Sequence, residues 1–165
     1  MIQCARTVCR PNKKMTAGRA EREGTTMTPE QLEKVKNFVS ISDTFNIWNN
    51  LELTDVGDGT ATIEVPITPN SLNSWNTPHG GLLFAMADVA CGVAAVSARM
   101  EKCVTASASI DYIAAAGSTG RLKAVARVLR SGRKLCFCAA EVRDDKGTLL
   151  NRLNTTMYYT GMKLE

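Results

Sequence analysis

The sequence predicts an α+β fold in which a curved antiparallel β-sheet wraps around one long central helix. The segment 80–99 is apolar nearly all round, so a helix formed there has to be buried on most of its sides. Several strand-like segments follow one another with short turns between them, which favours antiparallel pairing. A sheet that curves around the buried helix meets both conditions, and 165 residues suffice for one such domain.

The chain divides into a tail and a domain. Residues 1–26 hold six basic and two acidic side chains without an apolar period, which predicts a disordered N-terminal tail. Residues 27–165 form the predicted domain, and their 14 basic and 14 acidic side chains give no charge bias toward nucleic acid. Because the first twenty residues lack acids, a mitochondrial transit peptide stays open as a second interpretation of the tail.

The first elements of the domain have local signals of their own. Thr28, Pro29 and Gln31 have the pattern of a capping box, which predicts the start of a short amphipathic helix. The segment 47–67 alternates in polarity around an Asp-Gly pair at 58–59, which predicts a hairpin.

The second half of the domain is predicted to be mostly strand. A polar loop, 68–78, leads into the long helix. Four strands follow, over residues 103–114, 120–131, 134–143 and 148–160. Such a sheet leaves an edge strand and one flank of the helix uncovered, and dimerisation commonly hides both. We therefore expect a homodimer or a homotetramer.

The cysteines and the single histidine argue against a metal or redox site. None of the six cysteines forms a C-x-x-C pair, so we expect reduced thiols, no metal, no cofactor and a cytoplasmic location. No signal peptide or membrane span is predicted. The longest apolar run is rich in Ala and Gly and contains Asp88, which fits a buried helix better.

Asp88 is the feature that points to function. A lone carboxylate within an apolar helix is expensive to bury, so something has to pair with it or use it. Asn73, the triplet 79–81 (His-Gly-Gly) and Asp88 together resemble the active-site segment of hotdog-fold acyl-CoA thioesterases, in particular the PaaI-like and thioesterase-superfamily-member-2-like branch. The segments TASASIDYIAAAG and LRSGRKLCFC extend the resemblance, which covers about residues 43–160. It implies a hotdog fold, an acyl-CoA substrate and thioester hydrolysis.

Thioester hydrolysis needs an activated water and donors for the developing oxyanion. Gly81 lies at a predicted helix N-terminus, where a free N–H can polarise the thioester carbonyl. Asp88 lies about 10 Å further along the helix, too far to act on the same carbonyl. Two antiparallel helices in a dimer would bring Asp88 of one chain to Gly81 of its partner, as the resemblance also implies. Asp88 would then act as base or nucleophile.

Three further residues belong to the predicted catalytic set. Asn73 is a candidate to donate to the thioester oxygen or to hold the water, or it is a turn residue. His79 is a candidate base, although the resemblance implies that it positions the turn. By the same resemblance Thr105 orients the water, while its residue type also suits an ordinary strand.

The predicted substrate contacts lie in two segments. A basic turn has side chains suited to the phosphates of CoA, and the resemblance places the pantetheine arm along the end of the strand after the helix. These residues are Arg130, Ser131, Gly132, Arg133, Lys134 and Leu135 for the turn, and Ser107, Tyr112, Ile113, Ala114, Ala115, Ala116 and Gly117 for the arm.

Two other functions stay open at this point. An acyl-thioester dehydratase would pair its histidine with a carboxylate, and here Gly-Gly follows the only histidine. A non-catalytic acyl-CoA-binding module would not need Asp88 beside an apolar chain. The preferred acyl group has no signal in the sequence.

Overall fold

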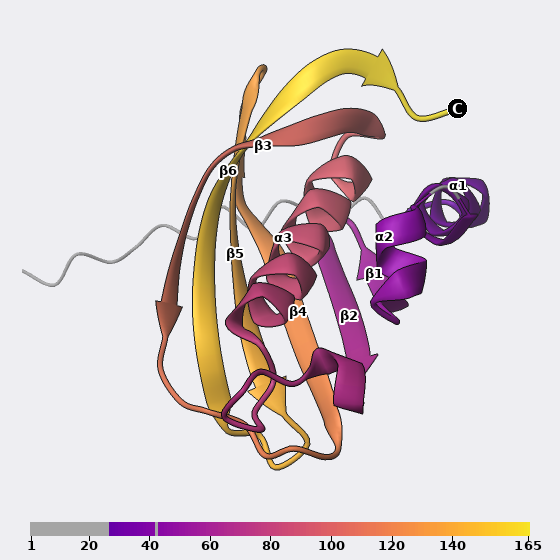
Figure 1. Cartoon of the computed structure of the whole chain (residues 1–165). Helices are drawn as coiled ribbons and strands as arrows, with labels where there is room; N and C mark the ends of the chain where they lie inside the picture. The colour runs from indigo at the N-terminus through magenta and orange to yellow at the C-terminus, as the bar shows by residue number, and fades with distance from the viewer. Residues whose placement is uncertain (1–26, 42) are drawn as a thin grey trace, which may run out of the picture.

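The structure, a computed structural model, describes residues 27–41 and 43–165. The tail predicted over residues 1–26 lies outside the described residues. Six strands form one antiparallel sheet that curves around a long helix, which confirms the predicted fold class (Figure 1). The strand order in the sheet is β1-β2-β4-β5-β6-β3, so β1 and β3 are its edges.

The element order is two helices, a hairpin, the central helix and four strands. The helices are α1 (Pro29–Ile41), α2 (Thr44–Trp48) and α3 (Gly80–Ser97), with a short 3₁₀ turn at Pro69–Ser71. The strands are β1 (Glu52–Gly57), β2 (Thr60–Pro66), β3 (Glu101–Tyr112), β4 (Arg121–Ser131), β5 (Leu135–Asp144) and β6 (Leu149–Lys163).

The capping box of α1 is confirmed. The Thr28 N–H donates to Gln31 Oε1 at 2.9 Å, and the Gln31 N–H donates to Thr28 Oγ1 at 3.2 Å. These two bonds satisfy backbone donors that the first helical turn leaves without partners.

The predicted start of the hairpin, at residue 47, is wrong. Residues 44–48 form α2, and β1 begins only at Glu52. Asp43 caps α2 because its Oδ1 accepts the N–H groups of Phe45 and Asn46 at 3.1 and 3.2 Å. The alternating apolar side chains at 45–48 are consistent with a strand as well as with one helical turn, and the cap decides between them.

The core lies between α3 and the concave face of the sheet. On β4 the buried Leu122, Ala124 and Ala126 alternate with exposed residues, as expected of a strand with one face covered. Small residues on α3, such as Ala90 and Ala94, let the helix approach the sheet closely. Among the described residues α3 is the one helix long and apolar enough to cross a membrane, and more than half of it is buried inside the protein.

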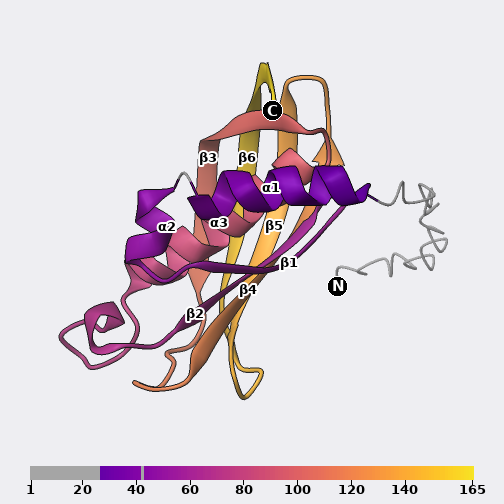
Figure 2. The same ribbon diagram turned by 90° about the vertical axis from the view of Figure 1, so that its right-hand side faces the viewer.

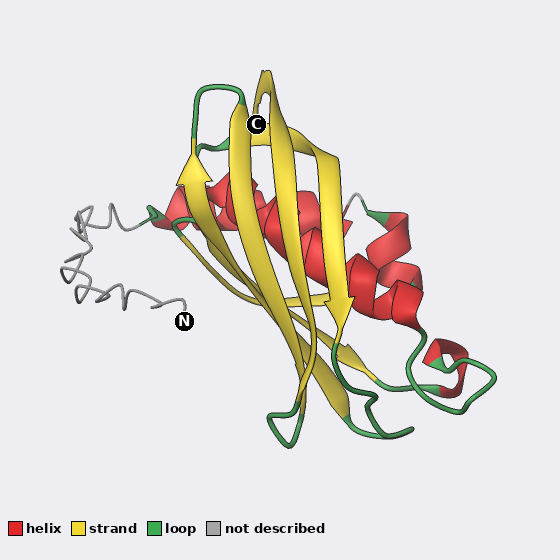
Figure 3. Cartoon of the chain, turned by 90° about the vertical axis from the view of Figure 1, so that its left-hand side faces the viewer, coloured by secondary structure: helices red, strands yellow, loops and turns green. Residues whose placement is uncertain are grey.

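The outer side of α3 and the convex face of the sheet differ in what packs against them. Helix α1 packs across the side of α3 that faces away from the sheet (Figure 2). Among residues 27–41 and 43–165, no helix covers the convex face of the sheet (Figure 3). Within the same residues, edge strand β3 pairs with β6 alone, and its residues 104–109 are all exposed. The predicted uncovered edge is therefore present in the single chain.

Candidate active site

The first turn of α3 pairs His79 with Gly81. His79 is the N-cap residue, and its Nδ1 accepts the Gly81 N–H at 2.9 Å. The Nδ1 atom of the imidazole is thus bonded to the backbone of its own turn. This geometry is that of a residue that shapes the turn.

Gly81 leaves little room for a side chain beside this contact. A Cβ on residue 81 would lie 3.0 Å from His79 Nδ1, a tight approach that the imidazole would have to relieve by shifting. The N–H that the sequence predicts for the substrate carbonyl is thus already paired within the chain, and a substrate oxygen has to share it with His79 or replace that nitrogen.

Asp88 and Thr105 meet although 17 residues separate them in the sequence. Thr105 Oγ1 donates to Asp88 Oδ1 at 2.9 Å. A β-bulge between Thr105 and Ser107 shifts the register of β3 against β6 at this point, and bulges commonly re-aim side chains beside active sites. In the described part of the chain no group donates to Asp88 Oδ2, which leaves this oxygen able to accept a proton.

Asp88 is half-buried, and its ionisation reflects two opposing effects. Burial among apolar side chains raises the pKa of the carboxyl above its ordinary value, and the hydrogen bond from Thr105 lowers it in part. A raised pKa makes a carboxylate a better proton acceptor near neutral pH.

A cavity of about 360 Å³ opens beside Asp88 and Thr105. Apolar residues of α3, among them Val89 and Val93, line it together with residues of α1 and α2. Cys103 also lines the cavity and is a second conceivable nucleophile. Burial raises the pKa of the Cys103 thiol to about 12, so the thiol is protonated at neutral pH and is a poor nucleophile.

Asn73 organises the loop before α3. Its Oδ1 accepts the N–H groups of Trp75 and Thr77 at 2.9 and 3.2 Å. These bonds use the carbonyl oxygen, which leaves the Nδ2 amide to donate. Asn73 therefore acts as a turn residue in this loop. Its free Nδ2 amide is still compatible with a role as donor to the substrate.

The basic turn lines a second hollow, of about 700 Å³, at the C-terminal end of α3. Arg130 and Arg133 line this hollow, as predicted for a phosphate site, and Arg127 and Arg99 join them. The sequence analysis missed Arg99. Its guanidinium donates to the carbonyl oxygens of Gly132 and Arg133 at 2.6 and 3.0 Å, and these partners lie more than thirty residues away.

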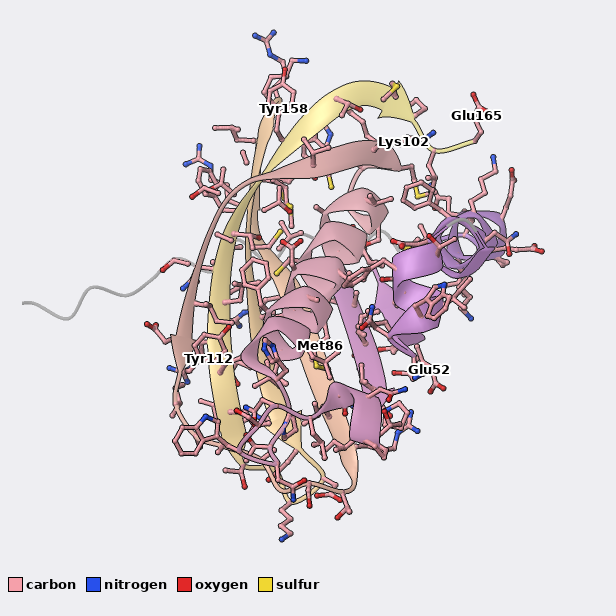
Figure 4. The ribbon with its side chains drawn as sticks, in the orientation of Figure 1. Glu52, Met86, Lys102, Tyr112, Tyr158 and Glu165 are labelled. Atoms are coloured by element: carbon pink, nitrogen blue, oxygen red, sulfur yellow. The ribbon has the colours of Figure 1, made fainter. Side chains whose placement is uncertain are left out.

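The two predicted substrate segments lie at opposite ends of the chain's fold. The Tyr112 hydroxyl donates to the Gly80 carbonyl at 2.9 Å, beside the N-terminus of α3. The basic turn lies at the other end, because Lys134 packs over the ring of Tyr158 at 5.5 Å. Figure 4 shows Tyr112 and Tyr158 toward opposite ends of the molecule. An 18-residue helix separates them, about 27 Å long. One chain therefore does not bring the segments 112–117 and 130–135 together.

Comparison with known proteins identifies the family. Residues 76–151 match the thioesterase superfamily. A Deinococcus radiodurans protein named "Putative esterase" is 33% identical over 101 residues, which cover 61% of this chain and 68% of that protein.

Two solved structures have a similar fold. The E. coli PaaI protein, from the phenylacetic acid degradation operon, has a TM-score of 0.77 at 19% identity, covering 82% of this chain and 98% of that chain. A hypothetical thioesterase of Streptococcus pneumoniae, solved with coenzyme A, has a TM-score of 0.65 at 26% identity, covering 69% and 88%. Sequence and fold agree with the resemblance carried by the His-Gly-Gly triplet and Asp88. The chain belongs to the thioesterase superfamily, and it is a thioester hydrolase with the hotdog fold.

Proposed function

We propose that the protein hydrolyses acyl-CoA thioesters and that Asp88 activates the attacking water. The observation that carries this proposal is the pairing of Asp88 with Thr105 in the lining of a mostly apolar cavity. The cavity suits an acyl group, and a carboxylate with one free oxygen suits a base. The structure of the pneumococcal thioesterase with coenzyme A supports CoA as the carrier.

The proposed reaction has two steps. Water attacks the thioester carbon while Asp88 Oδ2 takes one of its protons, and the N–H of the partner's Gly81 stabilises the oxyanion that forms. The oxyanion then collapses and breaks the carbon–sulfur bond, and the CoA sulfur receives the proton from Asp88. The products are the free acid and CoA. If Asp88 were instead the nucleophile, its carboxylate would displace the CoA thiolate and form a mixed anhydride with the acyl group. Water attacking the Asp88 carbon of that anhydride, in a single turnover in ¹⁸O water, would place ¹⁸O in the Asp88 carboxylate.

The site is proposed to be shared between two chains. Asp88 and Gly81 of one chain are about 10 Å apart along α3, and the two CoA segments lie at opposite ends of that helix. A second, antiparallel copy would place the 112–117 end of one chain beside the 130–135 end of the other. The exposed edge strand β3 offers unpaired backbone groups for this contact. A homodimer, or a tetramer of two such dimers, follows.

A panel of acyl-CoA thioesters with detection of the released thiol tests the proposed activity. Hydrolysis of at least one acyl-CoA is the expected result. Tight binding of acyl-CoA without thiol release would instead identify an acyl-CoA-binding module. Release of water from 3-hydroxyacyl-CoA would identify a dehydratase.

Thr105→Ala is expected to move the acidic limb of the kcat/KM profile to higher pH. The hydrogen bond from Thr105 stabilises the ionised carboxylate and so lowers the pKa of Asp88. Without that bond the pKa rises, and Asp88 loses its proton only at higher pH. Thr105→Ser keeps the hydroxyl and should leave the limb in place. If the acidic limb of the kcat/KM profile does not shift in Thr105→Ala, Thr105 has no part in setting the pKa of the catalytic carboxylate.

Arg133→Ala is expected to raise KM for acyl-CoA more than it lowers kcat. The side chain is exposed beside the second hollow, and a phosphate contact there is made equally in the ground state and the transition state. Lys36→Ala, which removes one positive charge from the exposed face of α1 outside this hollow, is the matched control. KM is measured by steady-state kinetics. Equal KM values in the two variants would show that the CoA phosphates bind elsewhere.

A further inference from the structure

Two hydrogen bonds hold the peptide group between Gly80 and Gly81, one at each end. The Gly80 carbonyl oxygen accepts the Tyr112 hydroxyl at 2.9 Å, and the Gly81 N–H donates to His79 Nδ1 at 2.9 Å. The carbonyl of Gly80 and the N–H of Gly81 belong to one planar amide, because a peptide bond joins the carbon of one residue to the nitrogen of the next. Both contacts therefore act on the amide whose N–H is proposed to stabilise the oxyanion.

Tyr112 reaches this amide from the end of β3. Its ring packs directly on Gly80, since a Cβ at residue 80 would lie 3.3 Å from Tyr112 Cε1. The backbone that follows is fixed to the sheet, because the N–H groups of Ile113 and Ala114 both donate to the Leu150 carbonyl, at 2.8 and 3.2 Å. Tyr112 is 55% exposed, so burial does not force its hydroxyl to find a partner in the chain. The bond to Gly80 instead ties the end of β3 to the first turn of α3.

A hydrogen bond to the oxygen of an amide strengthens the N–H of the same amide as a donor. The carbonyl draws electron density from the nitrogen by resonance, and a donor at the oxygen increases this effect. The gain grows with the negative charge on the acceptor, so it is larger for the oxyanion than for the ground-state carbonyl of the thioester. A polarised Gly81 N–H thus favours the transition state, although His79 Nδ1 also accepts it.

We propose that Tyr112 is a positioning residue whose hydroxyl orients and polarises the Gly80–Gly81 amide for the oxyanion. The inference rests on the proposed function, which places the oxyanion at the Gly81 N–H. It gives Tyr112 a different role from the contact with the pantetheine arm that the resemblance implies. The two roles lead to different kinetics, because a contact with the arm is made equally in the ground state and the transition state, whereas the amide acts chiefly on the transition state.

Tyr112→Phe is expected to lower kcat about three- to tenfold, the effect of one neutral hydrogen bond, and to leave KM for acyl-CoA nearly unchanged. The phenyl ring keeps its packing on Gly80, so the fold should be kept. Tyr158→Phe removes the same atom from a partly exposed ring toward the other end of the molecule (Figure 4). It is the matched control and should change neither constant. An unchanged kcat in Tyr112→Phe would overturn the proposal.

A short thioester separates the effect on the amide from binding of the pantetheine arm. An acyl-N-acetylcysteamine carries the reacting thioester without the nucleotide and without most of the arm. We expect Tyr112→Phe to lower kcat/KM by the same factor for this substrate and for the acyl-CoA with the same acyl group. A defect that appears only with acyl-CoA, or that lies in KM, would assign Tyr112 to binding of the arm and overturn the proposal.

Graded replacement of Tyr112 tests polarisation apart from packing. The amino acids 3-fluorotyrosine and 3,5-difluorotyrosine keep the ring and the hydroxyl, and fluorine makes that hydroxyl a progressively stronger donor. At a pH where every one of these phenols keeps its proton, kcat should rise in that order above the wild-type value. The same two amino acids at position 158 should leave kcat constant. A constant kcat across the series at position 112 would reduce Tyr112 to a structural contact.

The proposed function and this inference fail differently. If the wild-type protein releases no thiol from any acyl-CoA, the proposed function is wrong. If the wild-type protein hydrolyses acyl-CoA and a Tyr112→Phe protein that melts normally has the same kcat, only this inference is wrong.

Discussion

Asp88→Asn is expected to lower kcat by at least about a hundredfold, the usual size of general-base assistance, with KM changed only modestly. The amide is nearly isosteric with the carboxylate and still accepts the hydrogen bond from Thr105, so packing is kept. It has no oxygen that can take a proton from water. The loss therefore falls on the chemical step.

The same substitution should leave the protein at least as stable at neutral pH. Burial raises the pKa of Asp88 in the folded state, so folding favours the protonated form. The stability that this group contributes is fully present below its unfolded pKa and is lost as the pH rises through the folded pKa. A neutral amide does not suffer that loss, and the melting temperature should stay the same or rise at pH 7.

Turnover measured beside a thermal melt separates catalysis from structure. Asp55→Asn, at an exposed position of β1, is the matched control and should change neither quantity. A structural role for Asp88 predicts the opposite result, with a lower melting temperature and normal turnover per folded molecule. A folded Asp88→Asn dimer with near-normal kcat would end the mechanism proposed for this site.

Mixing two inactive variants should restore activity. Gly81→Val places its Cβ against the His79 ring and bulk beside the N–H proposed for the carbonyl, so we expect a loss of about a hundredfold or more. In a heterodimer of Gly81→Val and Asp88→Asn, one of the two shared sites has both wild-type residues. Random exchange of subunits should then recover about a quarter of wild-type activity.

Co-expression with two affinity tags isolates the heterodimer for this measurement. Asp88→Asn combined with Asp88→Ala is the control, because no pairing of those chains contains an intact site. Activity that stays at the level of the separate variants would show that Asp88 and Gly81 act within one chain. An active monomer in light scattering at assay concentration would lead to the same conclusion.

Local patterns in the sequence were enough for the elements that local rules govern. The capping box at Thr28 and Gln31, and the hairpin turn at the Asp-Gly pair 58–59, depend on spacings of two or three residues, and both are present in the structure. Asp88 could be singled out for a related reason, because a carboxylate in an apolar helix violates the pattern around it. The short helix α2 was missed because one helical turn is too brief for a period to show.

Contacts between distant segments were decided only by the tertiary structure. The bond from Thr105 to Asp88 depends on the register of β3 and on its bulge, and the bond from Arg99 to the basic turn joins residues 33 apart in the sequence. The sequence pointed to Gly81 as a donor but could not reveal that His79 already accepts its N–H. Side-chain directions across a helix and a sheet follow from how the two pack, and no spacing along the chain encodes that packing.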